Sequence, residues 1–285
     1  MANLTTHIIA SFFIFALGVW HLLCSFKAHL KNPNNYSAKL WYPILSKFKT
    51  LELYLQLAGI LLAIFYYLVI SADFDLMIKG STPVYRFLTL QTAAVLCIFL
   101  ILVVVVLIHE STPFLAGIPP GIFFLTAALG FGLQWAVLER GSSLTSTVEG
   151  KCEELLGKVA GFCCGCSILL AFQPKLFVAE LGLNSGLVLQ GLWFFQSGLS
   201  VYVRGFIPEG CERLLDVPRG VEGSMKCELE DYKLRALALF DFLFILYVIA
   251  VVVIDLTVCG FVGRVLGVRK HGGYEPLDTN HKVQP

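Results

Sequence analysis

Charged residues are scarce in this sequence. Only 14% of its 285 residues are Asp, Glu, Lys or Arg, whereas soluble domains carry about 25%. A soluble chain of this length would still need a polar surface, so a large apolar core does not account for the deficit. With 57% hydrophobic residues and a mean hydropathy of +0.77, the composition indicates an integral membrane protein.

The sequence also lacks the patterns of several large functional classes. The net charge is only +1 and no basic stripe or Arg-rich arm is present, which argues against nucleic-acid binding. No His-Glu-x-x-His, Gly-x-Ser-x-Gly or Walker sequence occurs, and no set of His, Asp and Glu has the spacing of metal ligands. We therefore expect neither a cofactor nor a metal, and none of these motifs assigns an enzymatic activity.

Seven long apolar segments fill almost the whole chain. Each has about the 17–25 residues that a membrane-spanning helix needs, and the strands of a barrel would alternate apolar and polar residues instead. No Lys or Arg precedes the first segment, so we expect a retained helix rather than a cleaved signal peptide. The sequence predicts an all-α, seven-helix membrane bundle over residues 1–262 and a cytosolic tail over 263–285, with spans at 7–26, 51–71, 86–108, 117–138, 155–173, 180–203 and 234–260.

The fifth segment is the least regular of the seven. It contains Lys158 and is rich in Gly and Cys. Either Lys158 extends towards the membrane surface or the helix begins later. An alternative count of six spans applies if this segment enters and leaves the membrane on one side.

The distribution of Lys and Arg predicts the orientation of the bundle. The first connection carries five lysines and usually dominates this rule, and the basic tail agrees with it. The connection between the sixth and seventh segments carries five basic residues as well, so the count is close. We therefore expect the N-terminus outside or in a lumen, and the C-terminus in the cytosol. A glycan on the sequon at Asn35, in the first connection, would contradict this orientation. The residues concerned are Lys27, Lys31, Lys39, Lys47 and Lys49 in the connection, and Arg264, Arg269, Lys270 and Lys282 in or beside the tail.

Nine cysteines divide by position. Cys152, Cys211 and Cys227 lie in connections expected on the non-cytosolic side, where disulfides persist. A disulfide is plausible there, with Cys211 and Cys227 favoured as partners, and three free thiols are the alternative. The run Cys163-Cys164-Gly165-Cys166 resembles a metal motif, but consecutive helical residues point about 100° apart, so helix packing is the favoured interpretation.

The second segment carries a polar stripe. Glu52 and Gln56 are one helical turn apart, with Gly59 and Ala63 further along the same face. Such groups should face the bundle, and His21 in the first segment could pair with Glu52 because both lie towards the same end. The pair is a candidate intramembrane site; the alternatives are that Glu52 faces water and that His21 bonds a neighbouring helix.

Two further polar groups lie in later segments. Gln190, Trp193 and Gln196-Ser197 follow one another at three- and four-residue spacing in the sixth segment, after a Gly182-x-x-x-Gly186 sequence that permits close helix packing. They either line a cavity or form an interhelical network. Asp241 lies well inside the seventh segment, and we expect it to face the interior and to be paired or protonated.

The tail contains Tyr274-Glu275-Pro276-Leu277. This fits the tyrosine-based pattern that endocytic adaptors bind, with Tyr274 and Leu277 as the residues that would be recognised. A cytosolic tail with this motif favours a location in the endomembrane system (Golgi, endosome or vacuole) or at the plasma membrane.

Residues 188–198, with the sequence V-L-Q-G-L-W-F-F-Q-S-G, resemble the sixth helix of the transmembrane protein 45 family. These are seven-helix proteins of plants and animals, grouped under a domain of unknown function. Residues 7–20 and Glu52 are similar to the same family. The resemblance implies the seven-helix fold but carries over no activity. Where relatives have histidines in the third and seventh helices, this chain has Leu90-Gln91-Thr92 and Leu239-Phe240-Asp241-Phe242, so any site those histidines form is depleted here.

Three functions follow as hypotheses. The first is binding or organisation of lipid and protein partners in the bilayer. The second is transport or channel activity, which requires Glu52, Gln190, Gln196 and Asp241 to converge on one cavity. The third is intramembrane lipid hydrolysis, which requires two ionisable groups near hydrogen-bond distance beside a pocket open to lipid.

Overall fold

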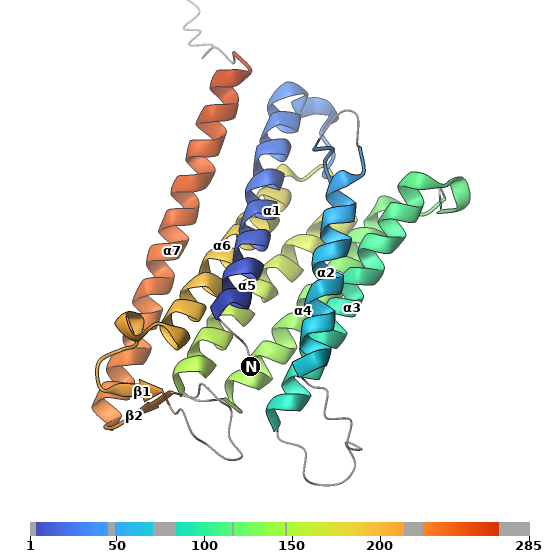
Figure 1. Cartoon of the computed structure of the whole chain (residues 1–285). Coiled ribbons are helices and arrows are strands. Elements are labelled where there is room, and N and C mark those ends of the chain that lie inside the picture. Colours follow the sequence, from blue (N-terminus) through green and yellow to red (C-terminus); the bar gives the residue numbers. More distant parts are fainter. Residues whose placement is uncertain are drawn as a thin grey trace, which may run out of the picture.

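The computed structural model describes residues 4–44, 49–70, 84–115, 117–145, 147–213 and 225–267. They form an up-and-down helical bundle (Figure 1). Its seven α-helices are α1 (Leu4–Lys31), α2 (Leu51–Ile70), α3 (Val84–Ser111), α4 (Pro120–Ser142), α5 (Thr147–Phe172), α6 (Phe177–Tyr202) and α7 (Glu230–Val265). The shorter elements are three 3-10 turns, η1 (Pro33–Asn35), η2 (Pro113–Leu115) and η3 (Arg204–Phe206), and two strands, β1 (Cys211–Arg213) and β2 (Met225–Cys227).

The helices fall where the apolar segments predict them, within a few residues at most ends. Six are long and apolar enough to cross a membrane, and α6 is not among these six. Of the seven spans that the sequence predicts, six are therefore supported by the length and apolar composition of their helices. The chain is a membrane-embedded helical bundle.

The helix α6, which is not among these six candidate spans, has the most sheltered position. Twelve of its 26 residues are buried, against four of 36 in α7. α6 packs against α1, α5 and α7, whereas α7 lies at one side of the bundle (Figure 1). Because its neighbours shield it from the surroundings, α6 can carry glycines, serines and amides that a helix facing lipid could not bury.

The fifth predicted segment forms one continuous helix, α5, which begins at Thr147, eight residues earlier than expected. Lys158 therefore lies inside the helix, and its Nζ is 2.5 Å from Glu154 Oε1 one turn earlier. This ion pair compensates the lysine charge within the helix. An uninterrupted helix of this kind does not have the shape of a re-entrant segment.

The cysteines of α5 serve helix packing. A Cβ added to Gly186 of α6 would collide with Cys163 Sγ, and one on Gly182 would lie 3.0 Å from Cys166 Sγ. Cys164 faces the other side, with its Sγ 3.4 Å from a Cβ on Gly132 of α4. The packing interpretation of this cysteine run is confirmed.

A small hairpin joins α6 to α7. β1 pairs antiparallel with β2, and Cys211 lies opposite Cys227, to which it is disulfide-bonded. Gly210 precedes β1 with φ +76°, and a Cβ there would collide with the ring of Tyr232. Only glycine fits this turn, which holds the hairpin against the start of α7.

We expect the disulfide to form in the cell and to stabilise the hairpin. Closing a loop of about 15 residues is worth about 3 kcal/mol, and Cys211 and Cys227 are 16 residues apart. Intact mass after alkylation without a reductant should show two thiols fewer in the native protein than after reduction. The Cys211→Ser and Cys227→Ser variants should each lose this difference, whereas Cys97→Ser, at an exposed free thiol, should keep it. An unchanged difference in the Cys211→Ser variant would contradict the pairing.

Candidate functional site

The candidate site is a buried cluster around Glu52 in the first turn of α2. Its Oε1 lies 2.6 Å from His21 Nε2 and accepts a hydrogen bond from Gln56 Nε2 at 2.8 Å. Its Oε2 accepts from Trp20 Nε1 at 3.1 Å and from the backbone N–H of Tyr42 at 2.8 Å. The carboxyl group thus brings together α1, α2 and the connection between them.

The cluster satisfies the requirements for burying a carboxylate. Glu52 is 2% exposed and His21 is buried beside it. A buried charge is costly unless it is paired and its remaining lone pairs are hydrogen-bonded, and four donors meet this condition here. For the carboxylate form of Glu52, which only accepts hydrogen bonds, the proton of this contact lies on His21 Nε2. The predicted pair of His21 with Glu52 is present, and Gln56 belongs to the same cluster.

A second buried acid, Glu180 in the first turn of α6, is connected to this cluster through Tyr42. The Tyr42 hydroxyl donates to Glu180 Oε1 at 2.7 Å. Burial raises the pKa of Tyr42 well above its usual range, and the nearby Cys24 and Glu52 raise it further. The phenol therefore stays protonated and remains a donor. Glu180 is 1% exposed, and its Oε2 has no hydrogen-bond partner among the described residues.

We call Tyr42, Glu52 and Glu180 the Tyr42 clamp. One carboxyl group accepts from the Tyr42 backbone and the other accepts from its side chain, so the residue is held at both ends. The loop is held at a second place by the hydrogen bond from Ala38 N to Pro174 O, at 2.7 Å. The α1–α2 connection is thus fastened across the ends of α2, α5 and α6.

Aromatic rings support the same connection. His29 of α1 stacks on Phe177 of α6 with ring centroids 4.1 Å apart. Tyr36 lies edge-on to both rings, at 5.2 and 5.4 Å. Such contacts between rings add stabilisation beyond the burial of apolar area, so they help to hold the connection against α1 and α6.

The two glutamines of α6 lie in different interfaces. Gln190 Nε2 is 3.7 Å from Cys163 Sγ of α5. Gln196 donates to Ser200 Oγ at 3.0 Å and accepts from the Tyr247 hydroxyl of α7 at 2.9 Å. Each amide contacts a different neighbouring helix. This agrees with an interhelical network, the second of the two interpretations of these glutamines.

Asp241 differs from the expectation that it faces the interior. Its side chain is 51% exposed, and its Oδ1 lies 2.8 Å from Lys151 Nζ on α5. The expected pairing is present, but at the edge of the bundle. Because α5 begins at Thr147, its first turns are helical and bring Lys151 alongside α7.

The four side chains required for a transport cavity do not converge. Glu52 bonds α1 and the first connection, Gln190 contacts α5, and Gln196 contacts α7. Asp241 pairs with Lys151 between α7 and α5. The condition on which the transport hypothesis rested is not met.

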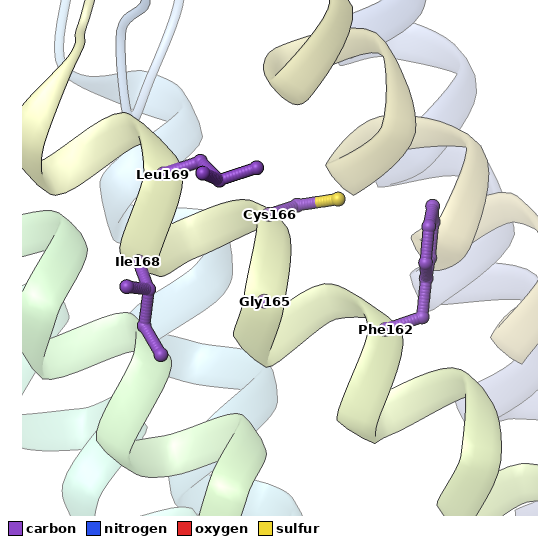
Figure 2. Close-up of a pocket in the computed structure, with 5 residues that line it drawn as sticks. All are labelled: Phe162, Gly165, Cys166, Ile168 and Leu169. Atoms are coloured by element: carbon purple, nitrogen blue, oxygen red, sulfur yellow. The ribbon is translucent and has the colours of Figure 1, made fainter.

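A hollow of about 420 Å³ lies on α5, away from the Glu52 cluster. Figure 2 shows it between Phe162 and Leu169, with Cys166 and Ile168 on the same helix. A Cβ on Gly165 would meet nothing within 4 Å, so this glycine leaves the hollow open. Its lining is apolar and includes none of the ionisable groups of the cluster. Two ionisable groups at hydrogen-bond distance, as the lipid-hydrolase hypothesis requires, are present in His21 and Glu52, but neither residue lines this hollow.

Sequence reasoning missed three members of the site: Trp20, Tyr42 and Glu180. Trp20 is adjacent to His21, and neighbouring helical residues were not expected to reach one acceptor. Tyr42 lies in an irregular connection and contacts a residue 138 positions away, so no periodicity marks it. Glu180 is the first residue of the sixth apolar segment, and its position as an acid in the first turn of that helix is the signal that could have found it.

Residues 120–260 match a family of unknown function, DUF716. The match covers α4 to α6 and most of α7. It includes Glu180, Gln190, Gln196 and Asp241 but stops short of Glu52, His21 and Tyr42. No curated protein matches the chain. This similarity agrees with the expected relation to a family without an assigned activity.

Within the described residues, no group of three or more His, Cys, Asp or Glu side chains is placed to hold a metal ion. The chemistry that the cluster offers is hydrogen bonding and charge compensation. Tyr274 and Leu277, the proposed sorting motif, lie outside the described residues.

Proposed function

We propose that this is a seven-span membrane protein of the transmembrane protein 45 type that binds and organises lipid and protein partners within the bilayer. The observation that carries this proposal is the state of Glu52, the most buried ionisable group in α2, which already accepts four hydrogen bonds from the protein. A carboxylate in this state holds elements together rather than acting on a substrate. The polar groups of α6 and α7 are likewise engaged with neighbouring helices.

The outer surface of the bundle supports the same proposal. Only four of the 36 residues of α7 are buried, and many long apolar side chains are exposed along the helix. α2 is similarly open, with Leu62 and Phe65 exposed. These helices present the broad apolar contact area that partners within a bilayer need.

That α6 forms the seventh span is part of the proposal. Its 26 residues extend about 39 Å at 1.5 Å per residue, and the hydrocarbon core is about 30 Å thick. Its place among α1, α5 and α7 (Figure 1) supports a crossing in which neighbours cover its polar residues.

The orientation also belongs to the proposal, with the C-terminus in the cytosol and the N-terminus outside or in a lumen. The fold places Lys175 and Arg264 at the same end as the basic first connection, which strengthens the excess of positive charge there. The disulfide-bonded hairpin lies at the opposite end, together with the start of α1 (Figure 1), as expected for an oxidising compartment. The endomembrane system or the plasma membrane fits both features.

The experiment compares two positions on α7 that differ in exposure. A photoreactive amino acid at Val253, 56% exposed, should capture reproducible lipid or protein partners in native membranes. The same group at Val251, 5% exposed, should react mainly within the chain. In parallel, purified protein in liposomes should add no solute flux and release no fatty acid from its lipids. Flux or lipid cleavage that disappears in Glu52→Gln would overturn the proposal in favour of transport or hydrolysis.

A further inference from the structure

One end of the bundle carries an exposed cationic surface. α1, α3, α5 and α7 end there, and α2, α4 and α6 begin there (Figure 1). In the described part of the chain, Glu110 is the one exposed acid at this end. Six exposed basic residues form what we call the basic surface: Lys27, Lys31, Lys39, Lys49, Lys175 and Arg264.

The acids nearest to the basic surface are turned inward. Glu52 and Glu180 lie at the starts of α2 and α6, yet both are buried and engaged with Tyr42. Neither is available to pair with an exposed lysine. Among the described residues at these two helix ends, the exposed charged side chains are therefore the basic ones.

The loops that carry the basic residues are held in place before any ligand arrives. The bond between Ala38 N and Pro174 O joins the first connection to the α5–α6 turn. Lys39 and Lys175 each follow one of these residues directly, so their backbones are neighbours. The Tyr42 clamp holds the same loop through Glu52 and Glu180, at the starts of α2 and α6. A surface ordered in this way loses little conformational freedom on binding.

We propose that the basic surface binds the phosphate groups of anionic phospholipids in the adjoining leaflet. This inference rests on the proposed function, because it names one lipid class among the partners. The ends of membrane-spanning helices lie at the depth of the headgroups. Each Lys or Arg near an anionic membrane surface strengthens binding by about fivefold. Lipid is the favoured occupant because the basic residues surround the helix ends that meet the headgroup layer.

The test uses the full chain purified in detergent and native mass spectrometry with dioctanoyl phosphatidylserine or dioctanoyl phosphatidylcholine. Inorganic phosphate is a separate arm that represents free phosphate. We expect phosphatidylserine to be retained in preference to phosphatidylcholine, and the preference to weaken as salt is raised. The Lys39→Ala/Lys175→Ala variant should bind phosphatidylserine about 30-fold more weakly. The matched control, Lys226→Ala/Lys233→Ala at the opposite end, should stay within about twofold of the native protein.

Several results would overturn the inference: equal retention of the two lipids, an equal loss in the control variant, or phosphate binding as tight as that of phosphatidylserine. If the Ala variant unfolds at a lower temperature, Lys39→Arg/Lys175→Arg must restore binding, since it keeps both charges; failure to do so also counts against the inference. If the protein shows no headgroup preference, the inference fails but the capture of partners at Val253 of α7 can still succeed. If the protein adds solute flux to liposomes, the proposed function fails but the headgroup preference can still be observed. The two proposals can therefore fail separately.

Discussion

Replacing Glu52 by alanine should lower the free energy of unfolding by about 3–5 kcal/mol, the range seen when one partner of a buried charged pair is removed. The substitution takes away the acceptor of four hydrogen bonds, from Trp20, His21, Gln56 and the backbone of Tyr42. Each buried donor left without a partner carries its own desolvation cost. Equilibrium unfolding in detergent micelles or nanodiscs measures the loss.

Two control variants separate the cluster from a general effect of removing an acid. Glu110→Ala removes an exposed glutamate at the same end of the bundle and should change stability by less than about 0.5 kcal/mol. Glu52→Gln keeps one acceptor oxygen but places an amide donor among existing donors, so it should fall between the native protein and Glu52→Ala. A loss for Glu52→Ala no larger than that for Glu110→Ala would show that the cluster does not stabilise the fold.

The pair of His21 with Glu52 could be predicted because it follows from rules that act locally and in sequence. Apolar runs set the helix positions, the direction of successive helices sets which ends meet, and intramembrane polar groups face the bundle. With α1 and α2 antiparallel, a histidine late in the first helix and an acid early in the second lie at the same level. Gln56 follows by helical spacing alone.

The rest of the cluster could not be predicted in the same way. The contact between Tyr42 and Glu180 joins a loop to a helix 138 residues away, and loop conformation has no hydrophobic period to reveal it. Asp241 shows the opposite difficulty. Its partner Lys151 lies before the fifth apolar segment, in a stretch that hydropathy does not mark as a helix. The sequence therefore gives no sign of the ion pair at the edge of the bundle, and it favours an interior position for Asp241.

α6 shows why hydropathy and burial can disagree in a membrane bundle. A helix enclosed by other helices gains little from large apolar side chains and more from close contact between backbones. Gly18 of α1 lies against the backbone of Val188, and Gly191 of α6 lies against the backbone of Phe15. The two helices thus approach through glycines from both sides, and the same residues lower the apolar content by which a span is recognised.

Replacing Gly191 by alanine should therefore be strongly destabilising for so small a change. The new Cβ would lie 2.6 Å from the backbone nitrogen of Phe15 and 2.8 Å from its Cα. A backbone cannot rotate away as a flexible side chain can, so α1 and α6 must separate along their contact. We expect a loss of about 1–3 kcal/mol, the usual cost of overpacking a core, measured by equilibrium unfolding of the reconstituted protein.

Gly165→Ala is the matched control, because it makes the same chemical change in α5 where a Cβ meets nothing within 4 Å. Alanine favours helix over glycine by about 0.5–1 kcal/mol, so this variant should be neutral or slightly more stable. Opposite signs for the two substitutions would establish that the α1–α6 contact depends on backbone proximity at Gly191. If Gly191→Ala is as stable as Gly165→Ala, the helices have room for the extra carbon and the close approach at Gly191 is not what holds α1 against α6.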